Sequence, residues 1–297
     1  MGCFFVSKNN HAVDLLSQHT HIFNCPVCHF ELSVNERSLV CPHGHRFDLS
    51  KHGYIHLCLQ AAGTKYDKSM FAARRMLSQV GLFEPLAEAI ATRIVKRLEP
   101  GVEHDTIKIL DAGCGEGSHL ERIHSLVRQN AALPTLGIGI DLAKEGVASA
   151  AKSYKELLWC VGDLANPPLA SQQFNVILNI LSPANYDAFH RLLCEGGIVI
   201  KVIPNRYYLC ELRDALWEGR QRSFSNDRTM QLFKKHFEHI EVQRVRYTYP
   251  LEPGQVQPLL AMTPLAWRAE DSKLNHFAAH PPTEITVDLT VMIGSKR

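Results

Sequence analysis

Between residues 107 and 203, the hydrophobic positions of this chain alternate between two patterns. Short apolar runs predict buried strands, and the stretches between them, where apolar residues recur every three or four positions, predict helices. Such alternation favours a parallel sheet covered by helices. The apolar runs lie at residues 107–110, 136–140, 157–161, 174–180 and 198–203.

Two further segments extend this core towards the C-terminus. Residues 240–249 and 285–293 alternate between apolar and polar positions, as strands do when one face is buried. Helices are expected between them and the core, at residues 207–217 and 229–237. The pattern therefore predicts an α/β fold with seven strands, the last two closing one edge of the sheet.

Shorter parts precede this core. Two helices are expected at residues 68–80 and 84–98, after a polar, glycine-containing linker at residues 60–65. The first 21 residues show no clear periodicity and predict a loosely ordered segment. The chain thus divides into an N-terminal extension at 1–23, a small cysteine-containing domain at 24–60, the linker and helices at 61–98, and the α/β domain at 99–297.

The composition is that of an ordinary globular protein. Of the 297 residues, 45% are hydrophobic and 21% are charged, which suffices for one large and one small domain. No stretch approaches the roughly 20 apolar residues that span a bilayer, so no membrane segment is expected. No export signal is evident, and the expected location is the cytoplasm.

Cysteines and a histidine stand at metal-ligand spacing in the small domain. Cys25 and Cys28 are followed, twelve residues later, by Cys41 and then His45. Two such knuckles around a short apolar stretch are typical of a zinc ribbon, in which a tetrahedral metal stabilises a segment too short to form its own core. His43 is the alternative fourth ligand. We expect this ribbon to fold apart from the α/β domain.

A glycine-rich turn follows the first strand of the α/β domain. Residues 109–117 read Ile-Leu-Asp-Ala-Gly-Cys-Gly-Glu-Gly and lead into a helix-like stretch. Gly113 and Gly115 let the backbone approach a ligand closely, and the start of the next helix offers unpaired N–H groups. This strand-loop-helix opening predicts a cofactor site.

The spacing of these glycines favours S-adenosylmethionine over a dinucleotide. A dinucleotide fingerprint would place its third glycine one residue later. Asp111 suits the cationic methionine end of S-adenosylmethionine, and Asp141, at the end of the next strand, suits its ribose diol. With these residues the chain resembles class I methyltransferases, and this resemblance implies that Asp163, after the third strand, lies against the adenine amine.

Asn179 and Ser182 stand at the exit of the fourth strand. The mouth of the active site lies outside the carboxyl ends of such strands, so both residues should meet the methyl donor or the acceptor. No reactive-cysteine constellation lies there, which favours a reaction without a protein nucleophile. We therefore interpret Asn179 and Ser182 as the catalytic residues, with Asn179 orienting the acceptor.

The net charge of +2 averages opposed segments. Residues 98–200 carry seven basic and twelve acidic side chains, whereas residues 65–97 carry seven and three, and residues 201–249 ten and six. Basic segments on both sides of an acidic core are what a nucleic-acid groove needs, although solvated helix faces would look the same. The expected RNA contacts are Arg46, Lys51, Arg74, Arg75 and Arg206.

Taken together, these motifs resemble those of the large-subunit ribosomal RNA guanine-N1 methyltransferases. The resemblance rests on the ribbon, on Ala-Arg-Arg at residues 73–75, on the glycine turn, and on Met-Thr-Pro-Leu-Ala-Trp-Arg at 262–268. It implies a class I methyltransferase (Rossmann-like) sheet and methyl transfer to guanine N1 in a hairpin of 23S ribosomal RNA. It also implies cofactor contacts from Phe83, Gly115, Glu116 and Tyr208.

Two other readings stay open on the sequence. A small-molecule methyltransferase with an accessory ribbon would need an apolar, lid-covered acceptor pocket and no basic flanks. A zinc-dependent RNA-binding protein with an inactive methyltransferase domain is disfavoured, because Asp111, Asp141 and Asp163 are all in place. For the oligomeric state, a homodimer is one possibility.

Overall fold

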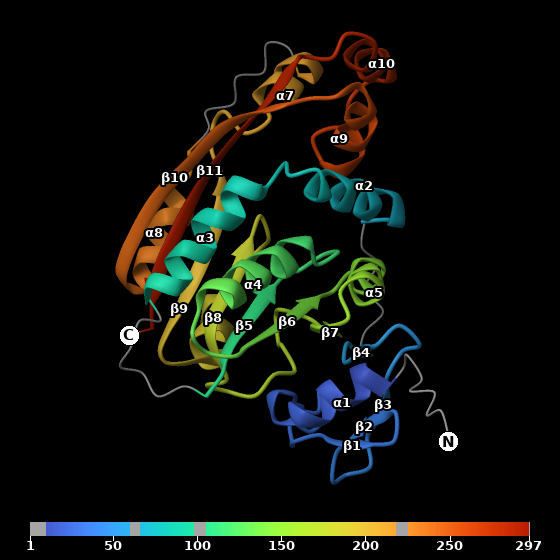
Figure 1. Ribbon diagram of the computed structural model, residues 1–297, viewed down its shortest axis with the longest axis vertical. Coiled ribbons are helices and arrows are strands. Elements are labelled where there is room, and N and C mark those ends of the chain that lie inside the picture. The colour runs from blue at the N-terminus through green and yellow to red at the C-terminus, as the bar shows by residue number, and fades with distance from the viewer. Residues whose placement is uncertain (1–9, 60–65, 98–104, 218–224, 297) are drawn as a thin grey trace, which may run out of the picture.

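An eight-stranded sheet runs through the centre of the protein in the order β10-β11-β9-β8-β5-β6-β7-β4 (Figure 1). The computed structural model describes residues 10–59, 66–97, 105–217 and 225–296. The strands of the sheet are β4 (Tyr54–His56), β5 (Ile107–Ala112), β6 (Thr135–Asp141), β7 (Leu158–Val161), β8 (Phe174–Ile180), β9 (Leu193–Pro204), β10 (Glu238–Pro250) and β11 (Glu284–Ser295).

All seven predicted strands are present, and the sheet has one more. Strands β4 to β9 of this sheet run parallel, and β11 and β10 close one edge in antiparallel pairing. The additional strand, β4, comes from the ribbon segment and pairs with β7, with Ile55 opposite Cys160. The expected count of seven was therefore one too low, because a three-residue strand leaves no periodic signal.

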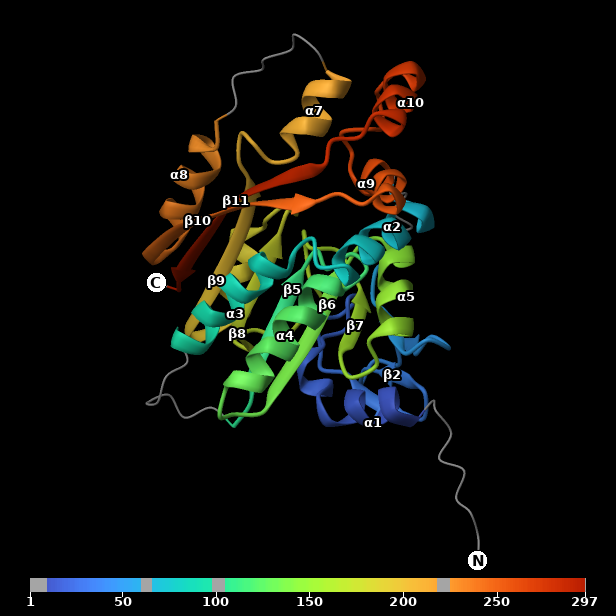
Figure 2. The same cartoon turned by 45° about the horizontal axis from the view of Figure 1, so that its top comes forward.

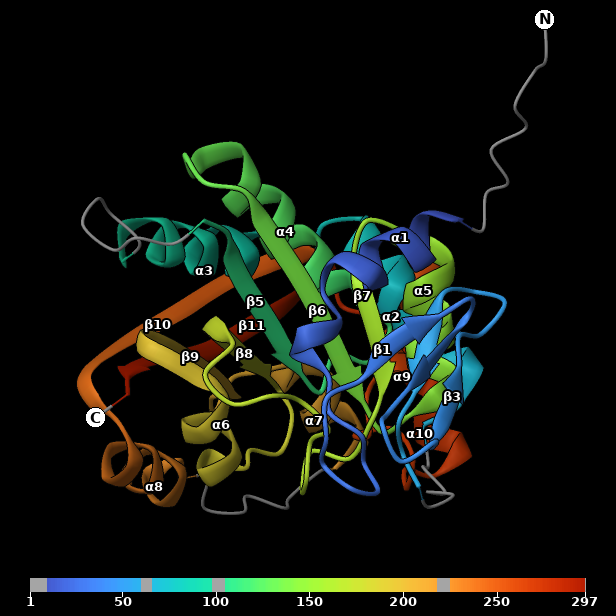
Figure 3. The same cartoon turned by 90° about the horizontal axis from the view of Figure 1, so that it is seen from below.

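Helices cover both faces of the sheet. Helices α3 (Glu84–Arg97), α4 (Ser118–Asn130) and α5 (Lys144–Ser153) lie on one side, while α6 (Tyr186–Leu192) and α8 (Asp227–His236) lie on the other (Figure 3). Neighbouring side chains of a strand point to opposite faces, so Ile109 and Leu110 belong to two different hydrophobic clusters. This three-layer packing explains why the central strands are apolar throughout.

A further layer of helices lies beyond the carboxyl ends of the parallel strands (Figure 2). Helix α2 (Lys68–Gln79) starts at Asp67, whose side chain accepts a hydrogen bond from the Met70 amide, and it packs against α9 (Val256–Met262). Helices α7 (Cys210–Leu216) and α10 (Asp271–Ala279) continue this layer, and the short 3-10 turn η2 (Pro253–Gln255) leads into α9.

Residues 10–22 are more ordered than the sequence predicts. Residues Asn10–Gln18 form helix α1, and the short turn η1 (Thr20–Ile22) follows it. Leu16 and Ile22 are buried in the same cluster as residues of the main sheet. A nine-residue helix has little stability of its own, so this packing is what stabilises it.

The zinc-ribbon segment shares its core with the α/β domain. Its strands β1 (Ser33–Asn35), β2 (Ser38–Val40) and β3 (Arg46–Asp48) form a small antiparallel sheet. Leu39 and Leu49 belong to the hydrophobic cluster that contains Ile138 of the main sheet. The ribbon therefore packs on the α/β domain, whereas the sequence suggested a separate unit.

Three parts of these expectations fall outside the described residues, namely residues 1–9 of the N-terminal extension, the linker at 60–65 and the helix end at Leu98. Within the described ranges, no helix combines the length and the apolar character needed to cross a membrane.

Candidate functional site

The predicted glycine turn joins β5 to α4. Gly113 and Gly117 have φ angles of 94° and 85°, a backbone region that favours glycine. A Cβ atom on Gly113 would lie 2.0 Å from Ser182 Oγ, and one on Gly117 would lie 2.4 Å from the Trp159 ring. The first glycine thus lets the turn meet the exit of β8, whereas the last one serves packing against β7.

A pocket opens above this turn, at the carboxyl ends of β5, β8 and β9. It contains about 1480 Å³ of empty space, including its open mouth. Strand order reverses between β5 and β8, since β5 is followed by β6 on one side while β8 lies on the other. Ligands of doubly wound sheets bind at this point. Its wall includes Gly113, Glu116, Ser182, Lys201 and Tyr208.

Asp111, at the end of β5, fits a cationic ligand. Its side chain is buried, and in the described part of the chain its Oδ1 atom has no hydrogen-bond partner. Burial, reinforced by the nearby Asp141 and Glu116, raises the pKa of Asp111 well above its usual value. A cationic amino group would supply both the missing partner and a compensating charge, so the site suits the methionine portion of S-adenosylmethionine.

Asp141 and Glu116 both stabilise the turn, and Glu116 also lines the pocket. Asp141 accepts hydrogen bonds from the Gly115 amide over 2.8 Å and from the Ala143 amide over 2.7 Å. Glu116 is buried and accepts two hydrogen bonds from Ser118 at the start of α4. Burial raises the pKa of both carboxyls. These hydrogen bonds use some of the oxygen lone pairs of each carboxylate, and the remaining lone pairs could accept a hydrogen bond from a ligand.

Aromatic side chains form another wall of the pocket. Phe83 and Tyr208 line it, and His119 packs edge-on against Phe83 with ring centroids 4.9 Å apart. Burial lowers the pKa of His119 to about 4 and raises that of Tyr208 to about 12. Both side chains are therefore neutral at physiological pH.

Asp163 does not reach the pocket. It is exposed after β7, and its Oδ1 atom accepts a hydrogen bond from the Ala165 amide over 2.8 Å. The residues that line the pocket do not include it. In this structure Asp163 closes a turn, so the geometry gives no support to its expected contact with adenine.

Asn179 is buried below the pocket. Its Nδ2 atom donates to the carbonyl oxygens of Ala112 and Pro183, over 2.7 and 2.9 Å. Its Oδ1 atom accepts from Lys201 Nζ over 2.6 Å, and Lys201 also donates to the Ser182 carbonyl. Asn179 thus has all its hydrogen-bonding groups engaged inside the protein, while Ser182 and Lys201 face the pocket.

The four predicted metal ligands come together in the ribbon. The Sγ and ring-nitrogen atoms of Cys25, Cys28, Cys41 and His45 all lie within 4.8 Å of one another. The Sγ atoms of Cys28 and Cys41 are 3.6 Å apart. Ligands on a tetrahedral zinc with bonds of about 2.3 Å would be about 3.8 Å apart, so the donor set fits zinc.

His45 is placed better than His43 as the fourth ligand. The Nδ1 atom of His45 lies 3.2 Å from Cys41 Sγ and 3.6 Å from Cys25 Sγ. The His43 ring instead packs edge-on against Phe30, with centroids 4.7 Å apart. Zinc bound here would hold the two knuckles of the ribbon together.

Two of the five expected RNA contacts are engaged within the protein. Arg74 lines the pocket and donates to the Met262 carbonyl over 3.4 Å. Arg75 joins α2 to α5 through hydrogen bonds to Ser149 and Ser153, over 3.1 and 2.6 Å. The structure thus places Arg74 beside the cofactor turn and Arg75 in a helix contact.

Arg46, Lys51 and Arg206 are exposed. Arg46, on β3, donates to Ser38 and Asp48, and Arg206 lies 5.9 Å from the centre of the Tyr207 ring. These three cations lie on two separate parts of the surface, the ribbon and the segment after β9. They remain candidates for phosphate contacts.

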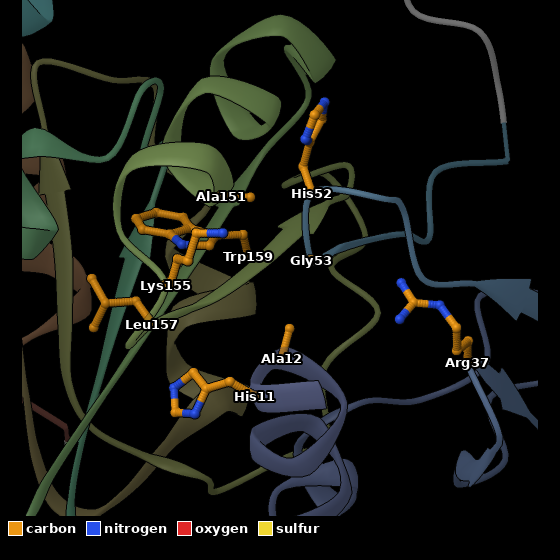
Figure 4. A pocket seen from close by; sticks show the side chains of 9 residues that line it. All are labelled: His11, Ala12, Arg37, His52, Gly53, Ala151, Lys155, Leu157 and Trp159. Atoms are coloured by element: carbon orange, nitrogen blue, oxygen red, sulfur yellow. The ribbon is translucent and has the colours of Figure 1, made fainter. Parts of the chain in front are cut away.

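A second hollow lies where α1, the ribbon and the end of α5 meet. Figure 4 shows His11, Arg37, His52 and Lys155 among the side chains around it. Burial lowers the pKa of His52, helped by Lys152, Lys51 and Lys155. Lys152 and Lys155, at and just after the end of α5, therefore add to the positive charge that Arg46 and Lys51 give the ribbon.

Sequence reasoning missed Lys201 and His119 as pocket residues. Lys201 is the one charged residue in the apolar run of β9, and such an interruption of a buried strand was the available signal. His119 lies just after the glycine turn, where its helix position carries no such signal.

Comparison with known proteins matches both parts of the chain. Residues 23–59 match a family model described as the N-terminal part of RlmA, a zinc ribbon, and residues 103–238 match a methyltransferase domain. The "Putative 23S rRNA (guanine-N(1)-)-methyltransferase YxjB" of Bacillus subtilis (strain 168) is 39% identical over 93% of this chain and 97% of its own length.

A more distant relative has the same kind of name. The 23S rRNA (guanine(748)-N(1))-methyltransferase of Streptomyces fradiae is 29% identical, over 91% of this chain and 95% of its own length. The likeness includes both the ribbon and the α/β domain. The chain belongs to the family of 23S rRNA (guanine-N1)-methyltransferases.

Proposed function

We propose that the protein transfers the methyl group of S-adenosylmethionine to N1 of a guanine in a hairpin loop of 23S ribosomal RNA. The observation that carries this proposal is the pocket at the reversal of strand order. It joins the glycine turn and Glu116 on one side to Ser182 and Lys201 on the other. A cofactor on the turn would thus stand beside polar groups that can receive a base.

In this proposal the cofactor contacts come from Phe83, Asp111, Gly113, Gly115, Glu116, Asp141 and Tyr208. S-adenosylmethionine supplies an electrophilic methyl group. The chain's own task is to hold it and to align guanine N1 with it. Ser182, which lies over Gly113, is well placed to position the acceptor.

The form of the pocket favours an RNA base over a small free substrate. Its mouth is open, and its wall carries Arg74, Glu116 and His119 as well as apolar side chains. At the mouth, Tyr66 and Trp267 lie with ring centroids 5.5 Å apart and are 42% and 41% exposed. Exposed aromatic rings can stack on bases, and a base must leave its stack to be methylated.

The remaining RNA would lie against exposed cations. We propose phosphate contacts for Arg46 and Lys51 on the ribbon and for Arg206 near the pocket, with zinc holding the ribbon in shape through Cys25, Cys28, Cys41 and His45. An RNA substrate agrees with the expected cytoplasmic location. A homodimer remains a prediction that light scattering can test.

The decisive experiment is mass spectrometry of nucleosides from 23S ribosomal RNA, isolated from cells with and without the protein. We expect N1-methylguanosine at one position to disappear when the gene is deleted and to return with the wild-type chain. A Gly113→Ala chain, whose cofactor binding should be weakened by the collision with Ser182 Oγ, is the matched control and should restore less N1-methylguanosine. Unchanged N1-methylguanosine, or a lost methyl group on N2 or N7, would contradict the proposal.

A further inference from the structure

Lys201 is a buried cation at the wall of the candidate active site. It lies on β9 opposite Met292 of β11 and is 5% exposed, yet it lines the pocket. Asp288, another buried charged side chain of the sheet, has an ionic partner in Arg244. Among the described residues, no carboxylate lies within ion-pair distance of the Lys201 ammonium. Within the described ranges, its hydrogen-bond partners are two neutral oxygens, Asn179 Oδ1 and the Ser182 carbonyl oxygen.

These two acceptors orient the amine. When Nζ is neutral, it has two N–H bonds and one lone pair. The two N–H bonds are used by Asn179 Oδ1 and the Ser182 carbonyl, which belong to the end and the exit of β8. The lone pair of Nζ then points away from these two acceptors. The open space beside Lys201 is the pocket, so the lone pair is directed towards it.

The surroundings favour the neutral amine. The other titratable side chains that line the pocket are Tyr66, Arg74, Cys114, Glu116, His119, Tyr186 and Tyr208, and none of them contributes to the pKa shift of Lys201. Burial alone lowers the pKa of Lys201 to about 8. A substantial fraction of the enzyme therefore holds a basic, uncharged amine near physiological pH.

We propose that Lys201 is the catalytic base that removes the N1 proton of the target guanine. The proposal deepens the proposed function and rests on it. Guanine N1 carries a proton and is a poor nucleophile until that proton leaves. An amine whose lone pair faces the pocket, held by two acceptors, supplies the missing acceptor for that proton.

The step balances without any further reactant. The Nζ lone pair forms a bond to the N1 proton, and the N1–H electron pair stays on the base, shared with the O6 oxygen. N1 then bonds to the methyl carbon while the bond from that carbon to the donor sulfur breaks, leaving neutral S-adenosylhomocysteine. The Lys201 ammonium later returns its proton to water. Asn179 is a positioning residue in this scheme, because it acts only through Lys201.

The first test compares Lys201→Met and Lys201→Arg with the wild type in single-turnover methylation of a 23S hairpin RNA. Met fills a similar volume without an amine, and Arg keeps the charge but does not deprotonate. We expect both variants to lose at least about 100-fold in rate. Calorimetric titration with S-adenosylmethionine and melting curves show which variants are folded, and the rates of the folded variants are compared with the wild type.

The pH dependence separates a base from a structural cation. For the wild type, the single-turnover rate should rise with pH and level off above about pH 8, the pKa of Lys201. In Lys201→Met this bend should vanish, and the rate should keep rising as hydroxide takes over the proton transfer. A bend at the same pH in both proteins would overturn the proposal.

A second measurement is chemical rescue of Lys201→Ala, whose short side chain leaves room for an added amine. Small primary amines added to Lys201→Ala should restore part of the rate, more strongly for more basic amines. A folded Lys201→Met enzyme with a rate within threefold of wild type would overturn the role of Lys201 while leaving the proposed function intact. A wild-type enzyme that does not methylate N1 at all would instead reject the proposed function itself.

Discussion

The Asn179 side-chain amide donates to the Ala112 carbonyl over 2.7 Å, which joins the end of β8 to the end of β5. These are the two strands between which the order of the sheet reverses. The same side chain accepts from Lys201 on β9. One buried amide thus ties together the three strand ends that border the pocket.

Asn179→Ala should therefore lower the methylation rate at least about tenfold, or about 1.4 kcal/mol of barrier. Lys201 would lose one of its two acceptors, and the carbonyl groups of Ala112 and Pro183 would lose their donor. Cofactor affinity should change less. Single-turnover assays and calorimetric titration measure the two effects.

Asn175→Ala is the matched control for this change. Asn175 is also a buried asparagine of β8, but it bonds to the Lys108 amide and to Cys194, away from the pocket. Both variants should be destabilised, by about 1–3 kcal/mol for each group left unpaired. Equal rates for the two variants would show that Asn179 has no role beyond stability.

Gly113→Ala should weaken S-adenosylmethionine binding at least about tenfold, since its new methyl group would collide with Ser182 Oγ. Gly196→Ala is the matched control, because it introduces backbone strain without a steric collision. Gly196 also has a positive φ, 72°, but nothing lies within 4 Å of its Cβ position. It should cost about 1 kcal/mol of stability and leave cofactor affinity unchanged. Isothermal titration and thermal melting of both variants decide the matter.

Asp111→Asn should stabilise the ligand-free protein at neutral pH and weaken cofactor binding. The folded-state pKa of Asp111 is raised, so its favourable contribution is complete below the unfolded pKa and is lost as pH rises through the folded value. Asparagine mimics the protonated form at every pH. The melting temperature of the variant should therefore exceed that of the wild type by more at about pH 8 than at about pH 5.

The same variant should bind S-adenosylmethionine less tightly by about 1.5–3 kcal/mol, the usual loss for a hydrogen bond to a charged group. In the wild type, cofactor binding should also release protons as Asp111 ionises. This is measured as a dependence of the binding enthalpy on the buffer. Binding without proton release, at unchanged affinity in Asp111→Asn, would rule out a salt bridge at this carboxyl.

Cys28→Ser should lose zinc and lower the melting temperature of the whole chain, by about 5 °C or more. Because β4 belongs to the main sheet and the ribbon shares its core, we expect a single broadened transition rather than separate melting of the ribbon. Elemental analysis and scanning calorimetry measure both quantities. Cys194→Ser, outside the metal cluster, should keep its zinc.

Arg206→Ala should weaken RNA binding and reduce the slope of log affinity against log salt by about 0.9. Arg75→Ala is the comparison, because its guanidinium bonds to Ser149 and Ser153 inside the protein. It should lower stability and leave the salt slope unchanged. If the salt slope changed for Arg75→Ala but not for Arg206→Ala, Arg75 rather than Arg206 would be the residue that contacts an RNA phosphate. Filter binding of the hairpin RNA at several salt concentrations provides the slopes.

Local spacing in the sequence was enough to predict the features that short segments decide. The glycine turn between β5 and α4 follows from residues 109–117, because a strand, a turn and a helix start are local structures. The metal ligands follow from the spacing of Cys25, Cys28, Cys41 and His45, since one zinc ion gathers two nearby knuckles. The order of strands and helices in the core follows from the spacing of apolar residues along the chain.

Only the tertiary structure decided what depends on distant segments meeting. The short strand β4 becomes part of the main sheet through its pairing with β7, a contact across more than 100 residues that no local pattern encodes. Arg74 and Arg75 look alike in sequence, yet one enters the pocket and the other bonds to α5. Lys201 is a lone polar residue in an apolar run until β9 is placed beside β8, where Asn179 and Ser182 receive its amine. The chemistry of the pocket is therefore set by strand order, because side chains far apart in sequence meet there at the ends of neighbouring strands.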